Sequence, residues 1–334
     1  MSTVFVSGVA GFLGSHLADL LVKEDHRVIG CDNLVGGELA NVSEEVEFYQ
    51  EDCADLEAMT RLTRDAEVVY HCAATAYEGL SVFSPSFITQ NIVQASVSLI
   101  SASVRNGVRR FVNCSSMARY GSNETPFVEE MEPRPQDPYG IGKVSVEQML
   151  RNLCGVHGME HVTVVPHNII GPRQKWDDPF RNVASIMANL MLQKRQPIIY
   201  GDGEQRRCFS FVSDVAEPML RLAFDEGLDG EVFNLGPDDA FITINELSLI
   251  LADIIGVDLE PIYVPDRPME VRFANCSADK ARRRLGYKAK VPLREGLESI
   301  VTHIERHGTR KFDYNIEVEI RNQHTPRTWT ERMF

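Results

Sequence analysis

A doubly wound parallel sheet of the α/β class is predicted by two features of residues 1–172. Short β-branched runs alternate with helical runs, at lengths typical of strand–helix–strand units. A glycine-rich turn joins the first of these strands to the first helix, and later strands end in small or hydroxyl-bearing residues. Ligands of such sheets bind beyond the carboxyl ends of the strands, so these ends mark the expected site.

Each element of this first part follows from a local pattern. Runs rich in valine, isoleucine and aromatic residues predict strands at 3–7, 27–31, 46–50, 68–74, 111–114 and 163–165. Apolar residues at helical spacing predict helices at 15–23, 87–104 and 139–152. His71, in the fourth strand, is expected to be a satisfied core histidine.

The pattern changes after Gly171-Pro172, where the chain becomes polar and the elements shorter. Helices are predicted at 183–192, 214–224, 244–255 and 278–285, short strands at 198–200 and 261–264, and an extended segment at 209–211. We expect a smaller mixed α/β domain at 173–309, interleaved with the domain at 1–172. The charged tail at 310–334 lacks periodicity, and the sequence leaves open whether it is loose or a strap docked by Trp329 and Phe334.

The chain has 334 residues and a net charge of −14 at pH 7. This charge argues against nucleic acid and anionic membranes as partners, because both bind basic surfaces. No apolar run is expected to span a bilayer, and the first residues enter a strand at once, which argues against a signal peptide. The seven cysteines lack a Cys-x-x-Cys pair and are expected to be free, buried thiols without a metal. We therefore expect a cytoplasmic protein.

The glycine-rich turn has the spacing of a dinucleotide-binding turn. Gly8 permits a tight turn, Gly11 lets a pyrophosphate approach the backbone, and Gly14 allows close packing of helix on strand. Asp32 ends the second strand eighteen residues after Gly14, near the offset of the acid that binds an adenosine ribose. A carboxylate there repels a 2′-phosphate, and no arginine lies in the next ten residues, which favours NAD over NADP.

A second motif begins at Asp137-Pro138-Tyr139, which has the features of a helix start, with Asp137 as the cap. Tyr139 and Lys143 lie one turn apart on the same helix face, and Glu147 follows them. We expect the lysine charge to lower the pKa of the tyrosine, so that the phenol can take a proton from an alcohol.

Together these residues resemble the extended short-chain dehydrogenases/reductases that modify nucleotide-activated sugars, and most closely the UDP-glucose (UDP-hexose) 4-epimerases, including bacterial forms found with polysaccharide genes. The resemblance runs from Thr3 to about residue 305. Besides the glycine turn, Asp32 and the Tyr139/Lys143 pair, it rests on Ser116, the runs 166–174 and 201–207, and Val271-Arg272. It implies a Rossmann-type NAD-binding domain at 1–172 and a nucleotide-sugar domain at 173–309.

The resemblance implies a role for each matching residue. Tyr139 would be base and acid on the sugar 4-hydroxyl, Lys143 would hold the nicotinamide ribose, and Ser116, preferred to Ser115 from its spacing to Tyr120, would bind the reacting oxygen. The residues expected to bind NAD are Gly8, Gly11, Phe12, Leu13, Gly14, Asp32, Asn33, Asp52, Cys53, Ala73, Ala74, Asn91, Lys143 and His167. The residues expected to bind the sugar nucleotide are Ser116, Tyr139, Asn168, Asn182, Arg207 and Arg272.

Two departures from the family pattern bear on the reaction. Met117-Ala118 follow Ser116, where dehydratases of the family have an acidic pair and decarboxylases have a glutamate, so 4-epimerisation is favoured. A dehydratase, decarboxylase or 4-reductase on the same kind of substrate remains the alternative, with a non-catalytic NAD-binding scaffold as the minor one. Ser277 stands where many relatives have aspartate, so a ribose or base contact there is in doubt.

The sequence does not identify the sugar or the nucleotide, although 77–81 and 175–182 are expected to line the hexose pocket. The resemblance implies a homodimer, in which the helices at 87–104 and 139–152 pack across a two-fold axis. The apolar residues available for this packing include Val97, Leu99, Ile100, Val146, Met149 and Leu150.

Overall fold

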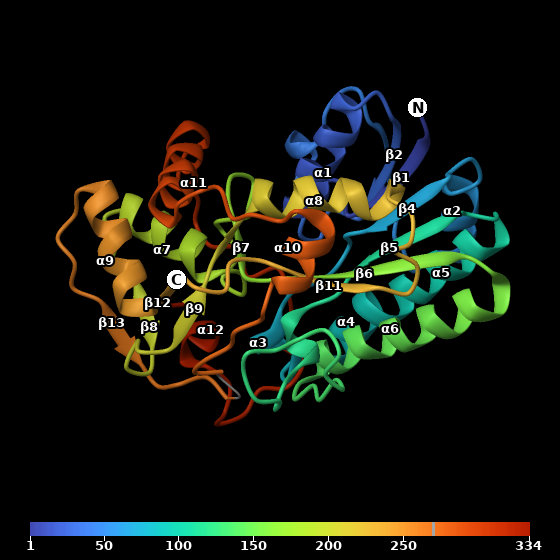
Figure 1. Ribbon diagram of the computed structural model, residues 1–334. Helices are drawn as coiled ribbons and strands as arrows, with labels where there is room; N and C mark the ends of the chain where they lie inside the picture. Colours follow the sequence, from blue (N-terminus) through green and yellow to red (C-terminus); the bar gives the residue numbers. More distant parts are fainter. Residues whose placement is uncertain (269–270) are drawn as a thin grey trace.

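The computed structural model of the chain describes residues 1–268 and 271–334. Its centre is a seven-stranded sheet in the order β11-β6-β5-β4-β1-β2-β3, and every neighbouring pair is parallel (Figure 1). The strands are β1 (Thr3–Ser7), β2 (Arg27–Asp32), β3 (Glu47–Gln50), β4 (Val68–His71), β5 (Arg110–Cys114), β6 (Glu160–Pro166) and β11 (Val232–Leu235). The predicted α/β fold with a doubly wound parallel sheet is confirmed.

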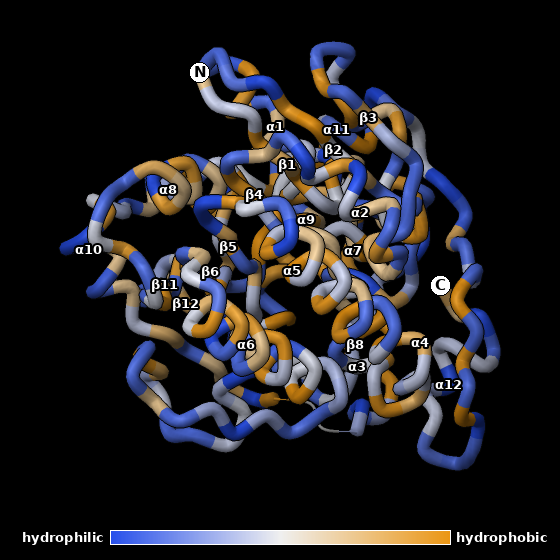
Figure 2. The backbone as a smooth tube through the Cα atoms, turned by 90° about the vertical axis from the view of Figure 1, so that its right-hand side faces the viewer, coloured by the Kyte–Doolittle hydropathy of each residue, from blue (hydrophilic) through white to orange (hydrophobic). Residues whose placement is uncertain are grey.

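Helices cover both faces of this sheet, and two separate apolar clusters lie between the layers. One face carries α2 (Leu56–Leu62), α5 (Ala95–Arg105) and α6 (Pro138–His157), and the other carries α1 (Phe12–Lys23), α8 (Val212–Phe224) and α10 (Asp279–Leu285) (Figure 1). Hydrophobic and hydrophilic stretches alternate along α6, as one buried helix face requires (Figure 2).

A second group of elements lies beside the main sheet. It contains α7 (Val183–Leu192), α9 (Ile244–Ile255) and α11 (Leu293–His307), which share an apolar cluster of their own. Three two-stranded sheets pair β7 (Ile169–Ile170) with β10 (Ser210–Phe211), β9 (Arg206–Cys208) with β12 (Phe241–Thr243), and β8 (Ile198–Tyr200) with β13 (Ile262–Val264). Both α8 and β11 come after residue 173. Because β11 joins the main sheet and α8 covers one of its faces, the two parts of the chain interleave.

The remaining elements are short: η1 (Leu39–Asn41), α3 (Glu78–Ser81), η3 (Met117–Arg119) and α12 (Arg327–Thr330). Before α5, α4 (Pro85–Thr89) and the π-helical η2 (Gln90–Gln94) form one continuous run with it. By length and composition this run at 85–105 could cross a membrane, so the expectation that no run would be long enough is wrong. Half of its apolar window is buried, and it packs against α2 and α6 as a core helix.

The helix that begins at Pro138 is longer than predicted. The Asp137 carboxylate accepts a hydrogen bond from the Gly140 amide at 2.9 Å, which caps the helix start. The helix continues to His157 and ends where Gly158 takes a left-handed conformation, with φ of +74°. This helix therefore fixes the Tyr139 and Lys143 side chains on a rigid element one turn apart.

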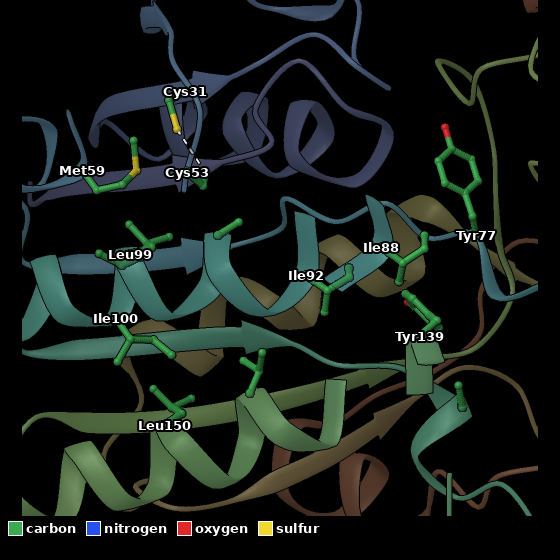
Figure 3. Close-up of a cluster of buried hydrophobic side chains, with 14 of the residues drawn as sticks. Cys31, Cys53, Met59, Tyr77, Ile88, Ile92, Leu99, Ile100, Tyr139 and Leu150 are labelled. Carbon is green, nitrogen blue, oxygen red and sulfur yellow. Dashed lines mark hydrogen bonds between the residues drawn. The ribbon is translucent and has the colours of Figure 1, made fainter. Parts of the chain in front are cut away.

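Four of the residues named for a two-fold interface lie in the core of the chain itself. Leu99, Ile100, Val146 and Leu150 are at most 1% exposed and belong to the cluster between the sheet and α5/α6 (Figure 3). They face the sheet because a helix covering it must bury its apolar stripe there. An interface on these helices would therefore use their outer faces.

All seven cysteines are free, and six of them are buried. Two pairs lie on neighbouring segments, with Sγ–Sγ distances of 3.6 Å for Cys31–Cys53 and 3.7 Å for Cys72–Cys114 (Figure 3 shows the first pair). The predicted burial of the thiols is therefore confirmed for all but Cys72, which is partly buried.

His71 is a core histidine, as expected. The Ser7 and Ser96 hydroxyls hydrogen-bond its two ring nitrogens, each at 2.7 Å. Burial, with the Lys143 charge adding to it, lowers the pKa of His71 to about 3. The ring is therefore neutral in the folded protein under conditions where an unfolded histidine is charged.

This burial predicts a loss of stability in mild acid. Between pH 6.5 and about 3 the unfolded chain binds a proton at position 71 and the folded chain does not, so stability falls as pH falls. The linkage is about 1.4 kcal/mol per pH unit, or about 2 kcal/mol from pH 6.5 to pH 5. Urea unfolding of the wild type and His71→Gln at pH 7 and pH 5 should show the wild type losing about 2 kcal/mol more than the variant. Equal losses would contradict the assignment.

Candidate active site

A cavity of about 530 Å³ lies beyond the carboxyl ends of the main-sheet strands and extends to α7 and β8. Eighteen of the twenty residues predicted for the site line it. They are Gly8, Gly11, Phe12, Leu13, Gly14, Asp32, Asn33, Asp52, Cys53, Ala73, Ala74, Asn91, Ser116, Tyr139, Lys143, Asn168, Asn182 and Arg207. Residues from distant parts of the chain thus meet at the edge of the sheet where the topology predicts a ligand.

The other two predicted residues do not line the cavity. His167 is 1% exposed and packs against Gly236, and burial lowers its pKa to about 4. Arg272 is exposed, and its guanidinium lies 2.6 Å from the Asp202 carboxylate. This ion pair lies outside the cavity, although the neighbouring residue Val271 lines it. The roles expected for His167 and Arg272 therefore stay predictions that the cavity does not support.

The glycine turn has the geometry that a pyrophosphate requires. Gly8 has φ of +71°, and a Cβ on Gly14 would overlap the Gly8 carbonyl oxygen. The helix that follows has no side-chain cap at Gly11 and no acid in its first turn, so its free amides face the cavity. These features suit an anionic group bound at the helix N-terminus.

Gly14→Ala should therefore remove the dinucleotide from the purified protein. The added methyl must push α1 away from the turn, which displaces the amides that would face the phosphates. The matched control is Gly155→Ala in α6, where an added Cβ meets nothing within 4 Å. This substitution should stabilise the folded protein by about 0.5–1 kcal/mol. NAD released by denaturation, measured per mole of protein, is the readout. A Gly14→Ala protein with full NAD content would contradict this geometry.

Asp32 is fixed at the end of β2 by the backbone around it. Its carboxylate accepts hydrogen bonds from the Leu34 amide at 2.8 Å and the Ala10 amide at 3.1 Å. Burial raises its pKa, and these amides oppose that shift. Next to it, the Asn33 amide group donates to the Asp52 carboxylate at 3.1 Å. The geometry thus presents acceptors at the place where the motif predicts an adenosine ribose.

The proton-transfer residues meet at the other side of the glycine turn. Tyr139 is 6% exposed, and the nearby Ser116 hydroxyl acts to lower its pKa. The Lys143 ammonium donates to the Cys114 carbonyl at 2.8 Å and lies 5.9 Å from the centre of the Tyr139 ring. All three residues line the cavity, so a ligand in it can reach the phenol and the ammonium together.

The predicted lowering of the Tyr139 pKa beside Lys143 is wrong for the protein alone. Burial raises the pKa of Tyr139 well above its ordinary value, and Glu78 and Asp137 add to the rise. Ser116 and Arg181 oppose this rise in the Tyr139 pKa. Burial also lowers the pKa of Lys143. In this apolar environment desolvation outweighs the attraction between phenolate and ammonium.

The two neighbouring serines, Ser115 and Ser116, both line the cavity but interact with different residues. The Ser115 hydroxyl hydrogen-bonds Glu147, whose carboxylate lies 2.9 Å from the Arg119 guanidinium. Both charged side chains of this pair are at most 6% exposed. Ser115 is therefore engaged in a buried network, whereas Ser116 is the serine that acts on the pKa of Tyr139.

Several lining residues have no role in the predicted set. Arg181 stacks on the Tyr77 ring at 4.6 Å and packs on Gly36, and Arg267 and Phe334 line the same cavity. Arg181 lies in the segment 175–182, which was expected, together with 77–81, to line the hexose pocket. That expectation was the only sequence signal for Arg181. No sequence motif marks Arg267. Across 1–268 and 271–334, no group of three or more His, Cys, Asp or Glu side chains is placed to hold a metal ion.

Comparison with known proteins identifies the family. The model of the NAD dependent epimerase/dehydratase family matches residues 4–236. The chain belongs to this family. NAD is therefore its cofactor, and the glycine turn, Asp32 and Lys143, which are predicted to bind it, line the cavity.

Relatives show the range of reactions within the family. A UDP-glucose 4-epimerase of Mycolicibacterium smegmatis is 33% identical over 306 residues, which are 89% of this chain and 96% of that protein. A crystal structure of the Thermotoga maritima UDP-glucose 4-epimerase with UDP-glucose is 35% identical, with a TM-score of 0.85 over 91% of this chain and 99% of that one. A UDP-N-acetyl-alpha-D-glucosaminuronate decarboxylase of Bacillus cytotoxicus is 28% identical over 89% of this chain and 95% of that protein. The chain is thus similar to nucleotide-sugar enzymes of more than one reaction type.

Proposed function

We propose that this family member is a 4-epimerase of a nucleotide-activated hexose, such as UDP-glucose/galactose or an N-acetyl or uronic analogue. The observation that carries the proposal is the meeting of Ser116, Tyr139 and Lys143 in the same cavity as the glycine turn. We also propose that residues 1–172 bind NAD and 173–309 bind the sugar nucleotide. Similarity to 4-epimerases over most of the chain supports the reaction.

Each residue of the site has a definite task in this reaction. Tyr139 takes the proton from the sugar 4-hydroxyl and later returns it, and Ser116 hydrogen-bonds the reacting oxygen. Lys143 holds ribose hydroxyls with the ammonium hydrogens that do not go to Cys114. NAD, when bound, would supply the hydride acceptor and donor for C4, so that the sugar passes through a transient 4-keto form. Asn168, Asn182 and Arg207 line the same cavity and would bind the diphosphate of the sugar nucleotide.

The side chains after Ser116 favour epimerisation over the other reactions of the family. Met117 and Ala118 both line the cavity, in η3, and neither can donate or accept a proton. Expulsion of the 6-hydroxyl needs an acid at the sugar, and the sequence supplies none at these two positions. A decarboxylase, dehydratase or 4-reductase is the second candidate, because the relatives include a decarboxylase.

The test is a panel of UDP-, GDP-, CDP- and dTDP-hexoses incubated with the purified enzyme and followed by NMR and mass spectrometry. The proposal predicts an isomer with inverted C4, unchanged mass and no accumulation of NADH. Loss of water or carbon dioxide would favour the second candidate. Tight NAD binding with no reaction on any hexose would indicate a non-catalytic scaffold.

We propose that the enzyme is a homodimer that works in the cytoplasm. The outer faces of α5 and α6 carry half-buried Val97 and Met149, and Ile141 and Val156 of α6 are 52% and 69% exposed. Such apolar side chains suit a packed interface between two copies. Seven free cysteines fit a reducing compartment. Sedimentation of only a 37.5 kDa species would contradict the dimer.

A further inference from the structure

Residues 310–334, the C-terminal strap, are docked along one side of the molecule (Figure 2). The strap begins at α7, where the Asn189 and Gln193 side chains each donate to the Arg310 carbonyl at 2.9 Å. It then reaches the start of α4, where the Glu319 carboxylate accepts hydrogen bonds from the Ser86 amide at 3.0 Å and the Phe87 amide at 2.7 Å. The strap therefore connects the substrate side of the chain to the main-sheet side.

The strap holds the residues around Phe180, which lines the cavity. Trp329 is 5% exposed and packs edge-on against Phe180, at 5.2 Å between ring centres, and against Phe83, at 5.7 Å. Tyr314 of the strap packs on the same Phe180 ring at 6.3 Å. Aromatic contacts of this kind fix both the position and the orientation of a ring.

Phe180 belongs to a loop, residues 177–182, that brings polar groups to the cavity. The Asp178 carboxylate accepts hydrogen bonds from the Tyr77 hydroxyl at 2.6 Å and from the Arg181 guanidinium at 3.2 Å. Asn182 caps α7 and lines the cavity beside Arg181. The Arg181 charge lowers the pKa of Tyr139, against the effect of burial. A shift of this loop would therefore move Phe180, Arg181 and Asn182, which line the cavity.

Two further contacts join the strap to the cavity wall. The Thr328 hydroxyl hydrogen-bonds the hydroxyl of Tyr200, which is a lining residue in β8. Arg310 forms ion pairs with Asp177, at the start of the loop, and with Glu38, next to the lining residue Gly37. Phe334 lines the cavity itself. The strap thus touches the cavity wall at several independent places.

We propose that the C-terminal strap is a positioning element that sets the affinity of the substrate pocket by holding loop 177–182 and Tyr200 in place. The inference rests on the proposed function only for the identity of the ligand. Trp329 acts through Phe180, and Thr328 acts through Tyr200.

The experiment compares Trp329→Ala with Arg327→Ala in the full-length protein as purified. Arg327 is the matched control, because it lies on the same short helix, is exposed and forms an ion pair with Glu331. The first readout is amide hydrogen exchange of residues 177–182, which does not depend on any ligand. The second is the affinity for UDP-glucose by calorimetry, together with KM and kcat for the hexose that the panel identifies.

Trp329→Ala is expected to speed amide hydrogen exchange in residues 177–182 by about tenfold or more. It should also weaken UDP-glucose binding, or raise KM, by about tenfold. The value of kcat should change less than about threefold. Arg327→Ala should change neither readout. Unchanged exchange in a folded Trp329→Ala protein, or a loss confined to kcat, would overturn the proposal. If Trp329→Ala fails to fold, Thr328→Val decides in its place, with β8 as the segment whose exchange should rise. Inactivity of the wild type on every hexose would refute the proposed function, while the exchange readout would still decide the role of the strap.

Discussion

Replacing Tyr139 by phenylalanine is expected to lower turnover by about 100- to 10,000-fold while leaving binding of the sugar nucleotide nearly unchanged. The variant keeps the ring that packs among Ile88 and Ile92 and loses only the hydroxyl that contacts Ser116 (Figure 3). Without that hydroxyl, no group in the same position can take the proton from the sugar 4-hydroxyl. Single-turnover rates and calorimetric affinity for the same substrate provide the measurement.

The matched control for this variant is Tyr263→Phe. Tyr263 is 53% exposed on β13, and its hydroxyl donates to Asn245 at 3.0 Å, outside the residues that line the cavity. Its turnover should stay within about twofold of wild type, because exposed substitutions away from special features have small effects. A Tyr139→Phe enzyme with near-normal turnover would remove Tyr139 from the chemistry.

Glu147→Ala is expected to cause a large loss of stability, about 3–5 kcal/mol. The substitution leaves the buried Arg119 guanidinium without its carboxylate and the Ser115 hydroxyl without its acceptor. A charge stranded in the core costs far more than the pair contributed, because water cannot reach it. Urea unfolding gives the free energy of unfolding directly.

The control is Glu47→Ala at the exposed Arg27–Glu47 pair, where the atoms are closer, at 2.6 Å against 2.9 Å for Arg119–Glu147. Water solvates Arg27 when its partner is removed, so the unfolding midpoint should hardly move. Similar losses for the two variants would show that burial is not what makes the Glu147 pair costly to break.

The fold and much of the site could be predicted because their signals are local. The glycine turn and the Tyr139/Lys143 pair each depend on residues within one turn or one helix, and both are where the sequence places them. The strand β11 was missed because four residues between Gly230 and Gly236 carry too short a pattern to distinguish strand from loop. The helix α11 was missed although Leu297, Ile300 and Ile304 have helical spacing, so here the signal was present.

What could not be predicted depends on contacts between distant residues. The ion pair with Asp202 decides where Arg272 points, and the depth of burial decides the direction of the Tyr139 pKa shift. The docking of the tail depends on Trp329 meeting Phe83 and Phe180, far away in the sequence. None of these is visible in a pattern of single residues.

The most direct test of the account uses the hexose that the panel identifies, labelled with deuterium at C4 and incubated with the enzyme in ordinary water. The account predicts that both C4 epimers form, with unchanged mass and with the deuterium still at C4, because Tyr139 exchanges only the hydroxyl proton. Deuterium lost to water, or a product lighter by water or carbon dioxide, would contradict it.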